Sequence, residues 1–118
     1  MQLDTCSGGT LLTVLSLKWY HDPMWYTGHN YEEFECIGQG IDTHQLVKGY
    51  KLIIGGIEIA YDKGSKGHSD GDVLLHAIVD SLLGAISKGD IGQHFPSNDQ
   101  KWKNANSTIF LKHAYSLV

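Results

Sequence analysis

A broad apolar stripe at helical spacing runs through the middle of the sequence, over residues 71–88. Apolar side chains that recur every three or four positions form one face of an α-helix, so the stripe predicts an amphipathic helix there. Ser69, followed three residues later by Asp72, is an acidic variant of a capping box, and Gly89 is placed to end the helix with a positive φ. The apolar members of the stripe are Val73, Leu74, Ala77, Ile78, Leu82, Ala85 and Ile86.

The segments before this helix have the composition of strands and turns. We expect residues 34–41 to form a strand that closes on glycines, with Asp42, Thr43 and His44 at its end. The rest of this region divides into a turn over residues 46–49, a second strand over 52–59 with a bulge or bend at its Gly-Gly pair, and a flexible loop over 63–67. After the helix we expect a loop over residues 90–99. A further amphipathic helix follows over 107–118, and an apolar end inside a helix leads us to expect an incomplete chain.

The composition excludes several classes of protein. Nine lysines and no arginines stand against thirteen acidic residues, which argues against a nucleic-acid-binding module because such modules carry a basic face. No apolar run approaches the roughly 18 residues that a bilayer span needs. Cys6 and Cys36 are too few for a disulfide-dense secreted scaffold, so a reducing compartment is the simpler interpretation. Seven histidines in 118 residues instead favour a metal or acid–base site in one small domain.

The first 35 residues differ in character from the rest of the chain. An apolar run over residues 11–17 is similar to the hydrophobic part of a signal peptide, but Asp4 and no lysine precede it, so the usual positive start is missing. An aromatic-rich stretch over residues 18–26 and a polar stretch over 27–33 follow. We expect residues 1–35 to be a targeting remnant, an accessory extension or the product of a mispredicted start.

Asp42 and His44 form the first of three candidate sites. Side chains two positions apart on an extended strand point the same way, so both can reach one ion. This short pattern is common, and on the pairing alone a turn aspartate beside a polar histidine is the more frequent explanation.

The second candidate site is the segment from His68 to Asp72 that leads into the helix carrying His76. Asp72, His76 and Asp80 are spaced four residues apart and therefore share a helix face. The N-terminus of a helix offers free N–H groups and a partial positive charge, which suit phosphate. The alternatives are a satisfied core histidine at position 76, a capping role for Asp72, a loop acid at Asp70 and a surface or supporting carboxylate at Asp80.

The third candidate site is the glycine-containing loop after the helix. Residues 89–92 and 94–96 combine glycines, a carboxylate and an aromatic ring, which can grip a polyol or simply connect two helices. Taken with the other two sites, the sequence offers one aspartate and two histidines for a single divalent metal. Two histidines and one carboxylate leave a fourth tetrahedral position open, which is typical of a catalytic zinc site.

Several motifs occur in an order that is similar to a known family. They are Ile37-Gly38-Gln39-Gly40-Ile41-Asp42-Thr43-His44, residues 52–59, Gly67-His68-Ser69-Asp70-Gly71-Asp72-Val73-Leu74-Leu75-His76-Ala77, residues 82–85, Gly89-Asp90-Ile91-Gly92 and Phe95-Pro96. Together they resemble the 2-C-methyl-D-erythritol 2,4-cyclodiphosphate synthases of the non-mevalonate isoprenoid (terpenoid) pathway. The resemblance covers residues 36–118 and implies that they form the N-terminal part of the synthase domain.

The resemblance implies an enzyme, a phosphorus–oxygen lyase, that folds one substrate onto itself. The substrate of the family is 4-diphosphocytidyl-2-C-methyl-D-erythritol 2-phosphate. Its 2-phosphate attacks the β-phosphorus of its own cytidine diphosphate group, CMP leaves, and a cyclic diphosphate forms. Both reacting groups belong to one molecule, so the protein needs no nucleophile. It must instead reduce the repulsion between phosphates and hold the attack in line.

The resemblance also implies the metals and the assembly. The family holds one zinc ion per subunit through residues that match Asp42, His44 and His76, with a substrate phosphate oxygen as the fourth ligand. A second divalent cation, Mg²⁺ or Mn²⁺, binds with the substrate phosphates. The family forms homotrimers with active sites at the subunit interfaces, and we expect no nucleic-acid or membrane partner. In eukaryotes the family is linked to plastids, so we expect a plastid or plastid-derived organelle there and the cytoplasm otherwise.

The substrate site follows from the same resemblance. His68 matches a position credited with stabilising the transition state and is the predicted catalytic residue. Ser97 replaces the acidic residue that usually follows Phe-Pro in the family, which puts that contact in doubt. The predicted substrate-binding residues are Asp42, His44, His68, Ser69, Asp90, Ile91, Gly92, Phe95, Pro96, Ser97, Asn98 and Asp99.

The fold implied by the resemblance is α+β: a mixed β-sheet covered on one face by helices and incomplete at the C-terminus. An alternative to the synthase is a truncated, non-catalytic zinc-binding remnant of it. An unrelated zinc hydrolase is disfavoured, because the sequence has no His-Glu-x-x-His motif to supply a glutamate base.

Overall fold

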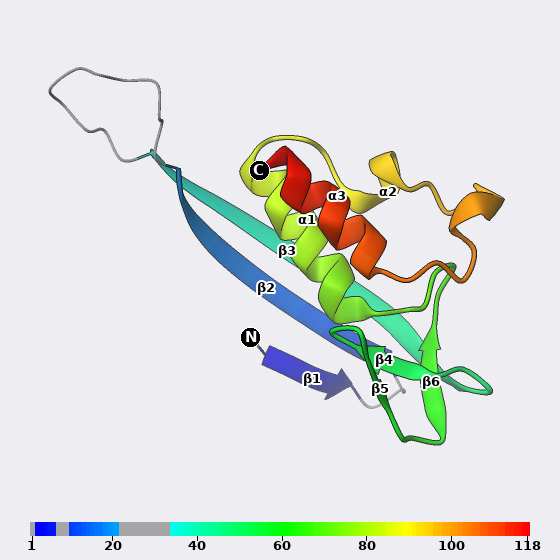
Figure 1. Cartoon of the computed structure of the whole chain (residues 1–118). Helices are drawn as coiled ribbons and strands as arrows, with labels where there is room; N and C mark the ends of the chain where they lie inside the picture. The colour runs from blue at the N-terminus through cyan, green and yellow to red at the C-terminus, as the bar shows by residue number, and fades with distance from the viewer. Residues whose placement is uncertain (1, 7–9, 22–33) are drawn as a thin grey trace, which may run out of the picture.

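The strands of the protein precede its helices along the chain (Figure 1). The computed structural model describes residues 2–6, 10–21 and 34–118, so the polar stretch predicted over 27–33 and most of the aromatic stretch lie outside the described residues. The strands are β1 (Gln2–Cys6), β2 (Thr10–His21), β3 (Phe34–Lys48), β4 (Leu52–Ile54), β5 (Ile57–Ile59) and β6 (Lys63–Lys66). The helices are α1 (Val73–Ala85), α2 (Ile91–His94), the 3₁₀ helix η1 (Gln100–Trp102) and α3 (Thr108–Leu117).

One sheet has the strand order β1-β2-β3-β6. β2 runs antiparallel to β3, with Thr10 opposite Gln45 and His21 opposite Phe34, and β6 pairs with residues 45–48 of β3. The predicted α+β class, with helices on one face, is confirmed. The predicted mixed sheet is corrected for the described strands, whose pairs are all antiparallel. A parallel pair needs a crossover, usually through a helix, and every described strand precedes α1.

β4 and β5 form a separate two-stranded hairpin. Gly55 and Gly56 make its turn with φ values of 63° and 79°, a region that favours glycine. The prediction of one bent strand over residues 52–59 was therefore wrong, because two successive positive φ angles reverse the chain. Residues 63–66 were predicted as a loop from their composition. They form β6, because their backbone pairs with β3.

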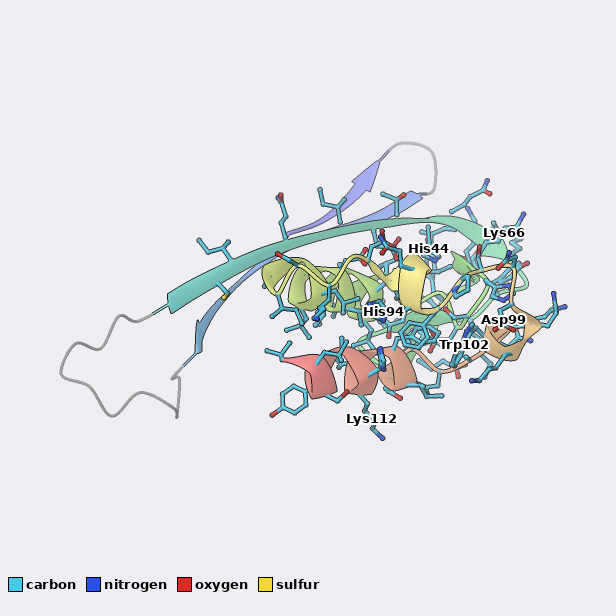
Figure 2. All side chains as sticks on the ribbon, turned by 90° about the horizontal axis from the view of Figure 1, so that it is seen from above. His44, Lys66, His94, Asp99, Trp102 and Lys112 are labelled. Carbon is cyan, nitrogen blue, oxygen red and sulfur yellow. The ribbon has the colours of Figure 1, made fainter. Side chains whose placement is uncertain are left out.

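Two glycines of β3 allow α1 to lie directly against the strand. A Cβ atom at Gly38 would overlap the carbonyl oxygen of Ser81, and one at Gly40 would overlap that of Ala77. Glycine in a strand often marks such a close approach of backbone. The sheet, α1 and α3 then stack as three layers, with α1 in the middle (Figure 2).

Asp72 begins α1 and ties the β4–β5 hairpin to it. Its Oδ1 accepts the N–H of Leu75 at 3.0 Å, as expected of an N-cap residue, and the N–H of Gly55 at 3.0 Å. Its Oδ2 accepts the N–H of Gly56 at 2.6 Å, and the side chain is fully buried. The predicted capping box is corrected: Asp72 itself is the cap, and Ser69 lies outside the helix.

The other predicted helix limits need small changes. α1 ends at Ala85, with Ile86 as its C-cap, earlier than predicted. Gly89 has a positive φ of 83° but lies in the following loop. That loop contains the single turn α2 rather than irregular structure alone. The last helix is confirmed as α3, which packs on α1 around a core of Val79, Leu82, Leu83, Phe110 and Ala114.

Among the described residues, no helix combines the length and apolar character that crossing a membrane requires.

Candidate functional site

Asp42 and His44 project from β3 toward α1. They follow Gly38 and Gly40 at alternate positions, so all four face the helix, whereas Ile41 is 54% exposed on the opposite face. The prediction that the pair shares one direction is confirmed. Its predicted place at a strand end was wrong, because residues 45–48 continue β3 as a ladder with β6 instead of forming a turn.

His76 reaches the same place from α1. Its Nδ1 lies 3.0 Å from Oδ2 of Asp42, and Nδ1 of His44 lies 3.1 Å from that same oxygen. One potential ligand atom from each of the three residues lies within 4.8 Å of the others. The structure therefore brings together the three residues that the sequence singled out as metal ligands.

The geometry of this cluster fits a divalent metal ion. In a tetrahedral zinc site with bonds of about 2.0–2.1 Å, neighbouring ligand atoms stand about 3.3 Å apart. The two separations from Asp42 Oδ2 are close to that value. Nδ1 of His44 is buried and lies 3.1 Å from Oδ2 of Asp42, but it makes no well-aligned hydrogen bond within the described part of the chain, so it can coordinate an ion. Asp42, His44 and His76 can thus hold a metal and leave one position open.

The two imidazoles keep Asp42 ionised. Burial would raise the pKa of this carboxyl, but the neighbouring His44 and His76 side chains outweigh burial and hold the pKa well below its usual range. A carboxylate binds metal in its deprotonated form. The site is therefore prepared electrostatically for a cation.

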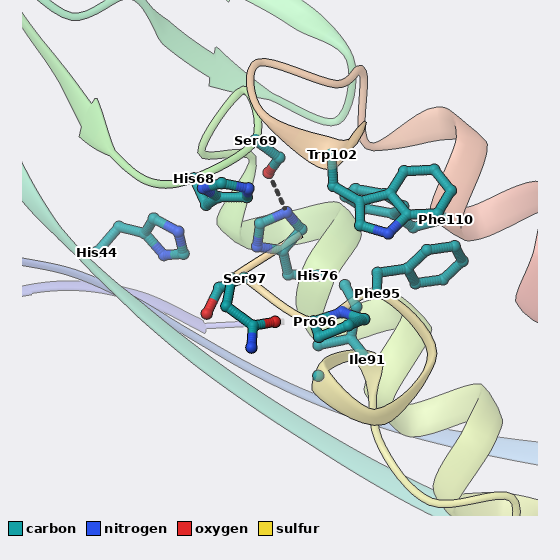
Figure 3. Close-up of a pocket in the computed structure, with 12 residues that line it drawn as sticks. His44, His68, Ser69, His76, Ile91, Phe95, Pro96, Ser97, Trp102 and Phe110 are labelled. Carbon is teal, nitrogen blue, oxygen red and sulfur yellow. Dashed lines mark hydrogen bonds between the residues drawn. The ribbon is translucent and has the colours of Figure 1, made fainter. Parts of the chain in front are cut away.

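A pocket of 520 Å³ opens beside the cluster (Figure 3). Three imidazoles lie on one side of it and three aromatic rings on the other. A ligand with a charged end and an apolar or sugar-like end matches this division. The lining residues are His44, His68, Ser69, His76, Ile91, Gly92, Phe95, Pro96, Ser97, Asn98, Trp102 and Phe110.

All predicted site residues except Asp90 and Asp99 lie in this pocket or in the adjoining cluster. Asp90 caps α2, and its side chain accepts the N–H of Gln93 at 2.9 Å; hydrogen bonds from Gln93 lower the pKa of Asp90. Asp99 caps η1, and its backbone carbonyl accepts a hydrogen bond from Nε2 of His68 at 3.0 Å. Both acids therefore shape the loop that borders the pocket.

Two pocket residues, Trp102 and Phe110, were missed by the sequence analysis. Phe95 packs against both, with ring centroids 4.9 Å from Trp102 and 4.5 Å from Phe110. Phe110 belongs to the apolar face of α3, so its residue type indicates core packing. Only the fold shows that this core borders a pocket.

The acidic residues near α1 hold neighbouring backbone. Asp80 accepts the N–H of Ile91 at 2.7 Å, which positions α2, and burial raises the pKa of this carboxyl. Asp70 accepts the backbone N–H of Ser107 at 2.9 Å and so joins the start of α3 to the loop before α1. The supporting alternative given for Asp80 in the sequence analysis agrees with these contacts, and Asp70, interpreted there as a loop acid, also holds backbone.

Nε2 of His76, on the far side of the ring from Asp42, lies near two hydroxyl groups. Oγ of Ser69 is 3.0 Å away, as the dashed line in Figure 3 marks, and Oγ of Ser107 is 2.8 Å away. Ser107 is fully buried and lay outside every candidate site of the sequence analysis.

A family model described as the YgbB family matches residues 36–118. The chain belongs to the YgbB family. The family resemblance drawn from the motifs is confirmed, and the matched region of this YgbB-family chain contains the whole cluster and pocket.

Named relatives agree with this membership. A 2-C-methyl-D-erythritol 2,4-cyclodiphosphate synthase of Chloroherpeton thalassium is 63% identical over 82 residues, which are 70% of this chain and 52% of the relative. One of Bacillus subtilis is 58% identical over 82 residues, with the same two shares. A solved structure of such a synthase in a CDP-bound form matches with a TM-score of 0.63 and 42% identity, over 68% of this chain and 53% of the other. The YgbB-family chain thus spans about half the length of these relatives.

Proposed function

We propose that this YgbB-family chain acts as a 2-C-methyl-D-erythritol 2,4-cyclodiphosphate synthase in the non-mevalonate isoprenoid pathway. The proposed substrate is 4-diphosphocytidyl-2-C-methyl-D-erythritol 2-phosphate, and the products are the cyclic diphosphate and CMP. The observation that carries the proposal is the Asp42–His44–His76 cluster beside a pocket lined by most of the predicted substrate residues. The names of the relatives support it.

Asp42, His44 and His76 would hold a zinc ion, whose positive charge would draw phosphate groups together and polarise a phosphoryl oxygen. The three side chains would supply three of the metal ligands, and the adjoining pocket would give a phosphate oxygen access to the remaining position. His76 and Asp42 come from two elements that are packed through Gly40, so the ligand positions are fixed before substrate arrives. A second divalent cation, Mg²⁺ or Mn²⁺, would bind with the phosphates.

Besides the metal ions, two side chains of the protein, those of His68 and Ser69, would bind the substrate phosphates. Both line the pocket just before α1, and the ring of His68 is anchored through Nε2 to the Asp99 carbonyl. An anchored imidazole keeps its orientation while charge develops on the phosphate oxygens, which is the requirement for transition-state stabilisation. Ser69 presents a hydroxyl next to His76 at the same end of the pocket.

The methylerythritol portion would lie toward the aromatic end of the pocket. Phe95 and Pro96 come from the loop after α2, and Trp102 closes the same end from η1. Ser97 and Asn98, also in that loop, offer polar groups to the hydroxyls of the sugar-like chain. A relative with a solved structure binds CDP, which contains the same cytidine group as the proposed substrate.

We further propose that the chain assembles as a homotrimer with active sites at the subunit interfaces, in keeping with the family resemblance. Residues 1–35 would be an extension to the synthase domain of residues 36–118. The expected compartment is a plastid or plastid-derived organelle in a eukaryote and the cytoplasm otherwise.

Release of CMP tests the proposed reaction. The purified chain is loaded with zinc, supplied with Mg²⁺ and the proposed substrate, and CMP is followed by ion-exchange chromatography. The proposed reaction requires that the wild type release CMP. Lys112→Ala should match the wild type, because Lys112 projects outward from α3, away from the sheet (Figure 2). The variant His76→Ala should release at least about 10²-fold less CMP.

Two results would contradict the proposed function. Equal CMP release from His76→Ala and the wild type would show that the cluster does not carry the reaction. Zinc binding by the wild type without any CMP release would favour the alternative, a non-catalytic zinc-binding member of the family.

A further inference from the structure

We propose that Ser107 and Asp70 are positioning residues that orient His76 and determine which of its ring nitrogens faces the metal. Neither residue was among the candidate ligands. Ser107 contacts His76 on the side of the ring away from Asp42, and Asp70 accepts hydrogen bonds from Ser107. The inference rests on the proposed metal site. It adds to that site a chain of hydrogen bonds from His76 through Ser107 to Asp70, which we call the relay.

The direction of the hydrogen bonds follows from a count of protons. Oγ of Ser107 donates its one proton to Oδ1 of Asp70, and the backbone N–H of Ser107 donates to Oδ2 of the same carboxylate at 2.9 Å. An ionised carboxylate accepts only, so this assignment cannot be reversed. With its proton used, Oγ of Ser107 can only accept from Nε2 of His76, which is 2.8 Å away.

This relay therefore places the ring proton of His76 on Nε2. A neutral imidazole carries one N–H, so Nδ1 of His76 presents its lone pair. Nδ1 lies 3.0 Å from Oδ2 of Asp42, so a metal ion can take this lone pair and a carboxylate oxygen together. A metal ion shared by Asp42, His76 and His44 satisfies both atoms. Ligating histidines commonly donate their second N–H in this way, which fixes the ring and makes it a better ligand.

The surroundings of Ser107 suit a positioning role. Ser107 is fully buried and is the residue immediately before α3, whereas His76 lies on α1. The hydrogen bond between them therefore joins the two helices beside the proposed metal site. Asp70 is fixed in turn, because its backbone N–H donates to the carbonyl of Ala105 at 3.0 Å and its Oδ1 accepts the N–H of Asp72. The relay is thus anchored on backbone at its far end.

Ser69 provides a matched control. Its Oγ also lies near Nε2 of His76, at 3.0 Å, so removal of either hydroxyl takes one acceptor from the same nitrogen. Of these two hydroxyls, the one that continues to a carboxylate is that of Ser107. A relay role predicts that the two serine variants differ, whereas a general need for polarity near His76 predicts that they behave alike.

The test measures zinc affinity of the full chain by competition with a chromophoric chelator. We expect Ser107→Ala to weaken zinc binding by about 10–100-fold, the usual effect of removing a partner of a metal-bound histidine. Ser69→Ala should stay within the error of the titration. Asp70→Asn keeps the size of the side chain but cannot accept at both former oxygens, and it should weaken binding in the same direction as Ser107→Ala.

A spectroscopic measurement separates positioning from a loss of fold. The chains are saturated with Co²⁺ in place of zinc, and circular dichroism confirms that each variant is folded at the temperature used. The visible absorption bands of Co²⁺ report ligand orientation, so Ser107→Ala should shift or broaden them while Ser69→Ala matches the wild type.

The outcomes are distinct. Wild-type zinc affinity and unchanged cobalt bands in a folded Ser107→Ala chain would overturn the relay while leaving the metal site intact. Equal losses in Ser69→Ala and Ser107→Ala would also overturn it. A wild-type chain that binds no zinc would overturn the metal site and the relay together.

Discussion

At the scale of single residues, the site divides its histidines between two tasks. His44 and His76 surround the Asp42 carboxylate, whereas His68 is anchored to the Asp99 carbonyl and faces the pocket. The alternation of a strand predicted that Asp42 and His44 share a direction. The residue type of His76 allowed the prediction that it is a metal ligand. The sequence could not show that α1 brings His76 next to β3, because that contact depends on how the two backbones pack.

The division of tasks predicts the behaviour of a His68→Ala chain. Because His68 lies outside the Asp42–His44–His76 cluster, the variant should keep its zinc. It should bind CDP more weakly than the wild type, since it lacks a pocket-facing group that is proposed to contact phosphate. Calorimetric titration with CDP and elemental analysis check the two halves. Loss of zinc with unchanged CDP binding would show that the roles of His68 and His76 are reversed.

The electrostatics of Asp42 predict how zinc binding depends on pH. The pKa of Asp42 lies well below its usual range, so this carboxylate stays charged as the solution is acidified through the region where imidazoles take up protons. Zinc affinity should therefore fall on acidification because protons compete with the metal for its other ligands, while the charge of Asp42 is retained. Asp42→Asn should bind zinc more weakly at every pH but keep the same fall. A pH dependence that disappears in Asp42→Asn would contradict this account.

At the scale of elements, the separation of β3 and α1 determines whether the cluster can form.

The sequence predicted some elements better than others. α1 and α3 were predictable because their apolar stripes have helical spacing. β3 was predicted too short, because Asp42 and His44 interrupt its apolar pattern although the backbone pairing continues. β6 was missed because residues 63–66 are polar and become a strand only through pairing with β3. Gly38 and Gly40 were interpreted as a strand end, because the helix that they contact is distant in sequence.

Gly40→Ala and Gly84→Ala form a matched pair that tests this contact. The Cβ of an alanine at position 40 would overlap the Ala77 carbonyl, so we expect a loss of about 2–3 kcal/mol in the free energy of unfolding. Gly84 is exposed on α1 with open space around its Cβ position, and alanine there should add about 0.5–1 kcal/mol. Urea titration of both chains measures the difference. Equal stabilities would mean that α1 does not pack against β3 at this distance.

At the scale of the whole molecule, the shape is elongated. The radius of gyration is 16.4 Å, against about 13–14 Å for a compact chain of this length, and the principal extents are 59, 31 and 20 Å. β2 and β3 run together beyond the end of α1 (Figure 1). On the face of β3 away from α1, Ile37 is 68% exposed and Ile41 is 54% exposed. Exposed apolar side chains on an uncovered sheet face are a feature of association surfaces.

Sedimentation equilibrium tests the proposed trimer. The wild type should sediment as a trimer, and Ile41→Asp should shift the distribution toward monomer by placing a charge on the apolar face. Ile109→Asp is the control, because Ile109 is 48% exposed on α3, away from that face. A wild-type chain that stays monomeric at every concentration would refute the trimer.

The central claim is that Asp42, His44 and His76 form one metal site, and the zinc content of the purified chain tests it most directly. Zinc per chain is measured by elemental analysis after loading and gel filtration. The wild type and the outward-facing control Lys112→Ala should each retain one equivalent, and His76→Ala should lose most of it, because one of three ligands to an open tetrahedral site is gone. A full equivalent of zinc in His76→Ala would contradict the site.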